Sequence, residues 1–356
     1  MKHVIVIGGG AAGCMAAVAA AQKGAAVTLL ERNPKLGRKL YITGKGRCNV
    51  TNDCAAPEVL QNVPRNSRFL TSAVTRFPPE AVKAFFEGLG VPLKTERGNR
   101  VFPCSDKAAD IIDALLLALR RSGVHIVQDR ARALRREGEI LTGVEGERGF
   151  YPGGAVVIAT GASHRPLGVP GEETLIGKGV HYCAACDGAP YRGKTVAVVG
   201  GGNSAAADAL TLSRIAKKVY LIHRRDSLRA TKVYHEPLMN APNVEFCWNS
   251  TVSALLHESR LTGLRLKDVN TSAERELACD GVFISVGRAP ATELFQSELA
   301  LDKSGYIMAD ESTRTNLPGV FAVGDVRTKA LRQVVTAVSD GAVAVHYAEE
   351  YLAENR

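Results

Sequence analysis

The sequence predicts an α/β fold in which parallel strands alternate with helices, and three observations lead to this prediction. A short β-branched run, a glycine-rich turn and an alanine-rich stretch follow one another at the N-terminus. The same order recurs in the second half of the chain, from Thr195 onward. Further apolar runs lie between and after the two copies, at 156–162, 281–287 and 319–324. Strands that alternate with helical segments are typical of parallel sheets covered by helices.

The N-terminal copy has the spacing of a dinucleotide-binding turn. We expect a strand at His3–Ile7, a Gly-x-Gly-x-x-Gly turn, a helix, and a second strand at 26–30 that ends at Glu31. This strand–turn–helix–strand context makes the glycine pattern specific. The glycines permit a tight turn and bring a pyrophosphate close to the backbone at the helix N-terminus. They are Gly8, Gly10 and Gly13.

The second copy repeats this arrangement. We expect strands at Thr195–Val199 and 219–222, with a glycine-rich turn and an alanine-rich helix between them. The candidate binding residues of this turn are Gly200, Gly202, Asn203, Ser204 and Ala205. One chain with two such patterns is predicted to bind two dinucleotides.

The two copies differ at the tip of the second strand, where the adenosine ribose lies. Glu31 comes 31 − 8 = 23 positions after its first glycine, and His223 comes 223 − 200 = 23 positions after its own. A carboxylate accepts hydrogen bonds from a ribose 2′-hydroxyl and repels a 2′-phosphate, which fits FAD or NAD. The second tip offers three guanidinium groups that suit a 2′-phosphate, and it therefore predicts NADPH. They belong to Arg224, Arg225 and Arg229. The alternative for these arginines is the solvated start of a helix.

A single pair of cysteines, Cys183 and Cys186, has two intervening residues. This spacing lets both sulfurs reach disulfide distance and can lower the pKa of one thiol. Such a dithiol can take electrons from a reduced flavin and pass them on by thiol–disulfide exchange. One alternative is a zinc half-site completed by His181 and Cys247, but no second pair exists, and we expect no metal. The others are an inert pair and a rival redox pair at Cys48 and Cys54.

Composition restricts the function classes. Lys and Arg exceed Asp and Glu by 45 − 36 = 9, but aromatic residues make up only 6% and no nucleic-acid-binding module is visible. We expect no nucleic-acid partner, and assign the basic excess to anionic cofactors and to solvated helix faces such as 130–136. Eight cysteines with one close pair indicate a reducing compartment, and no apolar run reaches membrane-spanning length. These features predict a cytoplasmic protein without membrane contact.

From about 159 to 352 the chain closely resembles the low-molecular-weight thioredoxin reductases. The matching stretches are Ala159-Thr-Gly-Ala162, Cys183-Ala-Ala-Cys186-Asp187-Gly188, Val199-Gly-Gly-Gly-Asn-Ser204, His223-Arg-Arg-Asp226 with Arg229, and Gly324-Asp325-Val through Leu331-Arg332-Gln333-Val334. They occur in the family's order.

The resemblance implies roles for these residues. Cys186 would face the flavin, Cys183 would attack the disulfide of a thioredoxin or thioredoxin-like protein, and Asp187 would act as a general acid. Asp325 would bind a ribityl hydroxyl of FAD, and the isoalloxazine would be lined by Arg332, Gln333 and Val334. Gly161 and Gly324 are expected in the FAD site and Gly287 in the NADPH site. Hinges near Gly161 and Gly287 would let the modules rotate, and the family implies a homodimer.

The first 150 or so residues resemble another group, the bacterial NAD(P)/FAD-dependent flavoproteins related to bile-acid-pathway reductases. The matching stretches are 31–40, 43–52 and 98–107. This resemblance implies that residues 37–46 lie along the FAD pyrophosphate and flavin, with Arg38, Lys39, Gly46 and Arg47 as candidate contacts. The backbone near Ala131 would meet the adenine. The chain therefore resembles a hybrid of two flavoprotein groups.

Together these observations predict two dinucleotide-binding domains of Rossmann type, with the second inserted in the first. The FAD domain is expected at 1–160 and 289–356, and the NADPH domain at 161–288. The predicted function is an NADPH-dependent, FAD-containing disulfide reductase. Two alternatives stay open: reduction of a different disulfide carrier, and a flavin-dependent dehydrogenase acting on a small unsaturated substrate. A non-enzymatic flavin-bound redox sensor is disfavoured by the complete NADPH pattern.

Overall fold

The computed structural model describes residues 3–41, 46–63 and 66–355, and the chain divides into two units. The outer unit comprises Met1–Ser163 and Pro290–Arg356, and the inserted unit comprises His164–Ala289. The chain passes from one unit to the other in β11 (Ala162–His164) and returns in β20 (Arg288–Pro290). Both units contain a parallel sheet with helices, so the predicted α/β class is confirmed.

The outer unit is built on a five-stranded parallel sheet in the order β21–β10–β1–β2–β6. Its strands are apolar on both faces: Ile5, Leu29 and Val157 are each 0% exposed. This is typical of parallel strands that are covered on both sides. The strands are β1 (His3–Ile7), β2 (Ala26–Glu31), β6 (His125–Gln128), β10 (Ala155–Ile158) and β21 (Val320–Ala322).

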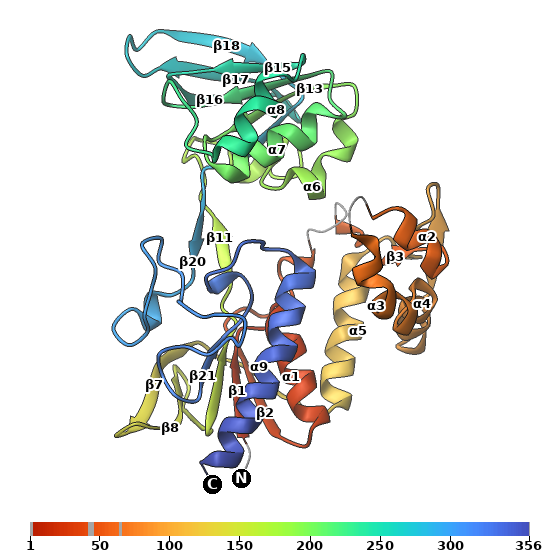
Figure 1. Cartoon of the computed structure of the whole chain (residues 1–356), viewed down its shortest axis with the longest axis vertical. Helices are drawn as coiled ribbons and strands as arrows, with labels where there is room; N and C mark the ends of the chain where they lie inside the picture. Colours follow the sequence, from red (N-terminus) through yellow and green to blue (C-terminus); the bar gives the residue numbers. More distant parts are fainter. Residues whose placement is uncertain (1–2, 42–45, 64–65, 356) are drawn as a thin grey trace. The chain divides into compact units, whose positions relative to one another are not determined.

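Three long helices accompany this sheet: α1 (Ala11–Gln22), α5 (Ala108–Arg121) and α9 (Val334–Glu354). Figure 1 shows them beside one another. A Cβ atom on Gly341 would lie 2.3 Å from the carbonyl oxygen of Ala12, so a glycine is needed where α9 crosses α1. Gln333 and Thr336 form a capping box that fixes the start of α9. None of the helices in the described part of the chain has the length and apolarity that a membrane crossing requires.

Our expectation that residues 130–136 form a solvated helix face is wrong. Residues 131–136 lie in β7 (Ala131–Glu137) of an antiparallel sheet with β8 (Ile140–Gly146) and β9 (Phe150–Pro152). Within β7, Leu134 is buried while Arg132 and Arg135 are exposed, and the pairing with β8 contains two register shifts. The arginines pair across the sheet, Arg132 with Glu147 and Arg135 with Glu145.

A small subdomain of the outer unit lies between β2 and α5. Its three-stranded sheet has the order β3–β5–β4, and three short helices accompany it. These elements are β3 (Thr51–Asn52), α2 (Ala56–Gln61), α3 (Thr71–Arg76), α4 (Pro79–Gly88), β4 (Leu93–Glu96) and β5 (Arg100–Pro103).

The inserted unit repeats the parallel architecture in the order β12–β19–β13–β14–β15. Its strands are β12 (Val180–His181), β13 (Thr195–Val199), β14 (Lys218–Ile222), β15 (Val244–Cys247) and β19 (Gly281–Ile284). Its helices are α6 (Ala184–Asp187), α7 (Asn203–Ser213) and α8 (His235–Met239). An antiparallel sheet completes it with β16 (Ser250–His257), β17 (Leu261–Asp268) and β18 (Glu274–Ala278).

A buried ionic cluster fixes the turn that follows β21. Asp340 on α9 accepts hydrogen bonds from the guanidinium of Arg327 at 2.8 and 2.9 Å, from Lys329 at 2.7 Å and from the backbone of Gly324 at 2.8 Å. Burial alone would raise the pKa of Asp340, but these donors outweigh burial and the pKa is lowered. The carboxylate therefore is the shared anion of two buried cations and holds the loop that begins at Gly324.

We expect Asp340→Asn to lower the free energy of unfolding by about 3–5 kcal/mol, because it leaves two buried cations without their anion. Since the folded-state pKa of Asp340 is lowered, its contribution is complete above the unfolded pKa and disappears as the pH falls through the folded one. Chemical denaturation at several pH values measures both effects. The Asp113→Asn variant, at an exposed position of α5, is the control. Equal stability of the two variants at neutral pH would contradict this prediction.

Candidate functional site

The glycines of the first turn have two separate structural roles. Gly8 has φ +106°, and a Cβ atom there would lie 2.6 Å from the oxygen of Ala159. A Cβ atom on Gly13 would lie 1.9 Å from the oxygen of Gly8. For Gly10, in contrast, no atom of the described residues lies within 4 Å of the Cβ position, apart from its chain neighbours and the backbone of its own helix. Gly8 and Gly13 therefore allow the helix to pack against the strand, whereas Gly10 leaves open space at the start of α1.

The acidic tip of β2 is bound to this turn. The Glu31 carboxylate accepts hydrogen bonds from the backbone of Gly9 at 2.8 Å and from Asn33, from its backbone at 2.7 Å and its side chain at 2.6 Å. Only 8% of Glu31 is exposed. A carboxylate has about four acceptor positions, so one remains for a ribose hydroxyl.

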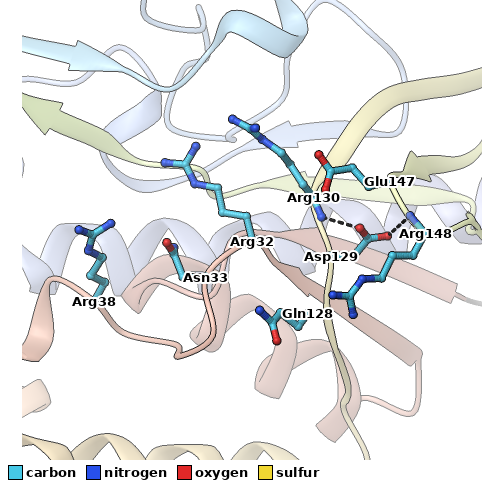
Figure 2. A pocket seen from close by; sticks show the side chains of 8 residues that line it. All are labelled: Arg32, Asn33, Arg38, Gln128, Asp129, Arg130, Glu147 and Arg148. Atoms are coloured by element: carbon cyan, nitrogen blue, oxygen red, sulfur yellow. Dashed lines mark hydrogen bonds between the residues drawn. The ribbon is translucent and has the colours of Figure 1, made fainter.

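A pocket of about 370 Å³ opens beside this tip (Figure 2). Its eight residues include four arginines, which gives the site a positive charge that suits an anionic ligand. Ala131, the candidate adenine contact, directly follows one of these residues in the chain. The lining residues are Arg32, Asn33, Arg38, Gln128, Asp129, Arg130, Glu147 and Arg148.

One wall of the pocket is fixed by a buried carboxylate. Asp129 accepts hydrogen bonds from the backbones of Arg130 at 2.7 Å and Arg148 at 3.1 Å, and from the Tyr151 hydroxyl at 2.7 Å. Figure 2 shows both backbone contacts. Because Asp129 holds Arg130 and Arg148 together, the pocket is a fixed feature of the β6–β9 region.

The C-terminal candidates of the outer unit lie together with Lys39. The Lys39 ammonium lies 2.7 Å from the Asp325 carboxylate. Arg332 donates to the backbone oxygens of Asp325 and Arg327, and its guanidinium lies 3.9 Å from the centre of the Tyr306 ring. The structure thus joins residues far apart in sequence around Asp325. Gln333 and Val334 follow, at the start of α9.

The candidates in the small subdomain fit a flavin contact less directly. The guanidinium of Arg47 pairs with Glu96 and Asp106 and lies 4.2 Å from the centre of the Phe102 ring. Its charge is therefore neutralised within the subdomain. Gly46 has φ +82°. The part of the predicted contact segment at 42–45 lies outside the described residues.

The second turn, in the inserted unit, has the same division of roles. Gly200 has φ +145°, and a Cβ atom there would lie 2.4 Å from the oxygen of Ser285. A Cβ atom on Gly201 would lie 2.2 Å from the imidazole of His223. Gly202 has open space at its Cβ position, as Gly10 has in the first turn. Asn203 begins α7 and accepts a hydrogen bond from the backbone of Thr231 at 2.8 Å.

The basic tip of β14 combines a buried histidine with exposed arginines. His223 is 5% exposed, and its Nε2 atom has no hydrogen-bond partner among the described residues. Burial lowers the pKa of His223, and the nearby arginines lower it further. Arg224, Arg225 and Arg229 are exposed, and the backbone of Arg229 donates to Gly201 at 2.7 Å. An unpaired buried nitrogen next to three guanidinium groups fits a phosphate-bearing ligand.

The two kinds of glycine predict separate effects of substitution. Gly10→Ala has room for its methyl group and should leave the unfolding free energy within about 0.5 kcal/mol of the original, while the methyl blocks the close approach of a pyrophosphate. Gly13→Ala collides with the Gly8 backbone and should cost about 1–3 kcal/mol. Denaturant titration of flavin-free protein and FAD titration followed by fluorescence measure the two effects. FAD affinity that is unchanged in Gly10→Ala would contradict the proposed position of the pyrophosphate.

The structure joins Cys183 and Cys186 by a disulfide, with Cα atoms 5.3 Å apart. Cys183 precedes α6, and its sulfur accepts a hydrogen bond from the backbone of Cys186 at 3.2 Å. Cys186 is exposed and Cys183 is half-buried. The pair is therefore preorganised at the surface of the inserted unit.

Asp208 on α7 supports this turn, although nothing in the sequence pattern singled it out. It accepts hydrogen bonds from the backbone of Ala184 at 3.2 Å and from the hydroxyl of Ser285 at 2.5 Å. Burial raises the pKa of Asp208. The sequence signal for Asp208 is its acidic side chain among the small and apolar residues of this helix. The pocket arginines Arg32, Arg130 and Arg148 were missed because they come together only through folding.

The rival pair at Cys48 and Cys54 has a different environment. Cys54 takes no part in a disulfide, and burial together with Glu58 and Asp53 raises the pKa of its thiol. A raised pKa reduces the thiolate fraction and with it the reactivity of a thiol. The geometry therefore favours Cys183 and Cys186 as the redox pair.

Comparisons with known proteins agree with this geometry. The family model of the pyridine nucleotide-disulphide oxidoreductases matches residues 2–341. The chain is 44% identical over 245 residues to the thioredoxin reductase of Streptomyces clavuligerus, which covers 68% of this chain and 76% of that protein. It is also 42% identical over 246 residues to the thioredoxin reductase of Listeria monocytogenes. This alignment covers 69% of this chain and 77% of that protein. The solved thioredoxin reductase of Streptococcus pyogenes is 32% identical, with a TM-score of 0.73 over 99% of this chain and 98% of that one.

The predicted resemblance to thioredoxin reductases is thus confirmed, whereas the second resemblance, of the N-terminal 150 residues, stays a prediction. A family model that spans nearly the whole chain, close relatives and a matching solved structure all lead to the same assignment. The chain belongs to the pyridine nucleotide-disulphide oxidoreductases and, within them, to the thioredoxin reductase family.

Proposed function

We propose that the protein is an NADPH-dependent, FAD-containing disulfide reductase that acts on a thioredoxin or thioredoxin-like protein. The observation that carries this proposal is the Cys183–Cys186 disulfide, which lies in the same unit as the basic dinucleotide-binding turn. Membership of the thioredoxin reductase family supports the same function. The proposed route takes electrons from NADPH through the flavin to the disulfide, and then to the partner.

The residues of the outer unit fit FAD. The open position at Gly10 leaves room for a pyrophosphate at the start of α1, and Glu31 has the chemistry to accept a ribose hydroxyl. The pocket lined by Arg32 and Arg38 would take the adenosine end. Asp325, together with Lys39, would bind the ribityl chain. When bound, FAD accepts a hydride from NADPH and passes two electrons to the disulfide.

The residues of the inserted unit fit NADPH. Gly202 leaves the pyrophosphate position open at the start of α7. The exposed guanidinium groups of Arg224 and Arg225 would bind the 2′-phosphate, and the unpaired Nε2 of His223 would reach the same ribose. Guanidinium groups bind phosphate through charge-assisted, often bidentate hydrogen bonds.

The cysteines then transfer the electrons by thiol–disulfide exchange. The Cys183 thiolate attacks one sulfur of the partner disulfide, and the partner's other sulfur leaves with a proton. Cys186 next attacks Cys183 in the mixed disulfide, which re-forms the Cys183–Cys186 bond and releases the second partner thiol. Asp187 supplies a proton in this cycle. The protein dithiol is oxidised by two electrons, and the partner disulfide is reduced by two.

Two experiments test the function. The purified protein should be yellow and should release FAD, not FMN, on denaturation. It should oxidise NADPH in the presence of at least one member of a panel of oxidised thioredoxins. A colourless protein that does not bind added FAD would overturn the proposal. If the Cys186→Ser variant still oxidises NADPH with a small unsaturated substrate, this result would favour the dehydrogenase alternative instead.

We also propose that the protein works as a homodimer in the cytoplasm, as its family membership and its reducing-compartment cysteine pattern suggest. Sedimentation velocity should then give twice the chain mass of 37.9 kDa. A sedimenting species with the mass of a single chain would reject the dimer and leave the proposed activity untouched.

A further inference from the structure

A buried histidine lies behind the acidic residue of the redox motif. His181 on β12 is 6% exposed, and its Nδ1 atom lies 3.4 Å from a carboxylate oxygen, Oδ2, of Asp187. Its Nε2 atom lies 2.7 Å from the hydroxyl of Tyr191. Each ring nitrogen therefore faces one oxygen, and the imidazole connects the interior of the inserted unit with the residue that follows Cys186.

The contacts of Tyr191 determine where the proton of His181 lies. Burial raises the pKa of Tyr191, and a side-chain contact with the Arg260 guanidinium acts in the opposite direction. A guanidinium can only donate, so the Tyr191 oxygen accepts from Arg260 and its own hydroxyl proton is available for Nε2 of His181. A neutral imidazole whose Nε2 accepts a hydrogen bond carries its proton on Nδ1. That N–H faces Asp187.

The surrounding core is shaped to hold this pair. A Cβ atom on Gly281 would lie 2.4 Å from the Tyr191 ring, so glycine at the start of β19 makes room for the tyrosine. Tyr191 is 2% exposed. The Phe283 ring stacks on His181 with ring centres 5.1 Å apart, and it meets Tyr191 edge-on at 5.5 Å. Neither ring can turn without displacing its neighbours.

We propose that His181, held by Tyr191, is a positioning residue for Asp187. The proposal rests on the reductase function proposed above. A carboxyl group can accept on one oxygen while it carries a proton on the other, so a donor at Oδ2 leaves Oδ1 as the oxygen that delivers the proton. Fixing the carboxyl group in this way holds Oδ1 in one position for proton transfer to the adjacent redox pair.

Besides the exchange with the partner, a step that uses this proton is the reduction of the Cys183–Cys186 disulfide. Two electrons, delivered from NADPH through the flavin, break the S–S bond. One sulfur takes the proton of Asp187 and becomes a thiol, and the other remains a thiolate. Asp187, whose side chain is 26% exposed, then regains a proton from water. A misplaced carboxyl group would slow this step without changing hydride transfer from NADPH.

Two substitutions of His181 separate positioning from packing. The amide nitrogen of asparagine occupies roughly the place of Nδ1, and that of glutamine roughly the place of Nε2. His181→Asn therefore keeps a donor toward Asp187 and should retain kcat within about threefold. His181→Gln keeps only the contact with Tyr191 and should lose kcat about tenfold, a fraction of the 10²–10⁴ that a general acid contributes. Tyr191→Phe, which removes the proton directed at Nε2, should also lower kcat several-fold.

The assay is NADPH-dependent reduction of oxidised thioredoxin, with kcat and KM for NADPH determined separately. Single-turnover flavin reduction by NADPH and the solvent deuterium isotope effect on kcat complete the measurement. We expect unchanged KM and flavin reduction in all variants, and a larger isotope effect in His181→Gln. His257→Gln, an exposed histidine on β16 outside this network, is the control and should match the original protein.

The outcomes distinguish this inference from the proposed function. If the unmodified protein reduces no thioredoxin, the proposed function fails. If it does, equal losses in His181→Asn and His181→Gln would show that His181 only fills space, and the inference fails. Full activity of His181→Gln and Tyr191→Phe would overturn it as well.

Discussion

Replacing either Cys183 or Cys186 with serine is expected to abolish disulfide reduction, with a loss of about a thousandfold or more. Thiol–disulfide exchange needs one sulfur to attack the partner and a second to release it, so neither cysteine can complete the cycle alone. Hydride transfer from NADPH to the flavin needs no cysteine and should stay rapid in both variants. Stopped-flow reduction of the flavin and steady-state reduction of thioredoxin measure the two halves separately.

The two cysteine variants should differ from each other in a way that tests the assigned roles. Cys183→Ser leaves Cys186, whose thiolate can donate charge density to the oxidised flavin and produce a long-wavelength absorbance band. Cys186→Ser should lack this band, and its Cys183 should trap a thioredoxin-like partner as a stable mixed disulfide. A trapped partner in Cys183→Ser and none in Cys186→Ser would reverse the assignment.

The matched controls are Cys48→Ser and Cys54→Ser, which remove the rival pair. The structure shows no disulfide at Cys54 and a raised pKa for its thiol, so both variants should retain most of the turnover. Loss of turnover in these controls, combined with activity in the Cys183 and Cys186 variants, would mean that the small subdomain of the outer unit contains the redox pair.

Local sequence patterns were sufficient to predict the two dinucleotide-binding turns. Gly8 and Gly200 follow β-branched strands, and the left-handed backbone that both adopt is one that glycine takes without strain. The disulfide at Cys183 and Cys186 followed from their spacing for the same reason: its geometry depends on four consecutive residues. These features are encoded within short segments, and they need no knowledge of the tertiary fold.

Features that depend on tertiary contacts could not be predicted from the sequence. The charge of residues 130–136 predicts a solvated helix face, whereas pairing with β8 places 131–136 in a strand. Lys39 and Asp325 are 286 positions apart, and nothing local predicts that they meet. The network at His181 depends equally on Gly281, which is far away in sequence and close to Tyr191 in space.

Replacing both Arg224 and Arg225 with glutamine is expected to raise the KM for NADPH about a hundredfold and to leave the KM for NADH nearly unchanged. Each charge-assisted contact with the 2′-phosphate contributes about 1.5–3 kcal/mol. Two contacts at the lower end of this range, as befits exposed side chains, amount to about 3 kcal/mol, which corresponds to roughly a hundredfold change. NADH lacks the phosphate, so it cannot lose these contacts.

Salt dependence adds a second test of the same residues. Exposed charge pairs are screened by added salt, so the KM of the unmodified protein for NADPH should rise with ionic strength, and this rise should be smaller in the double variant. Steady-state kinetics with both nucleotides at low and high salt provide the measurement. Lys267→Gln, which removes an exposed charge on β17 of the same unit, is the control for a general effect of net charge. If the unmodified protein already uses NADH as well as NADPH, the arginines at the tip of β14 do not select the phosphate, and the exposed guanidinium groups are a solvated surface after all.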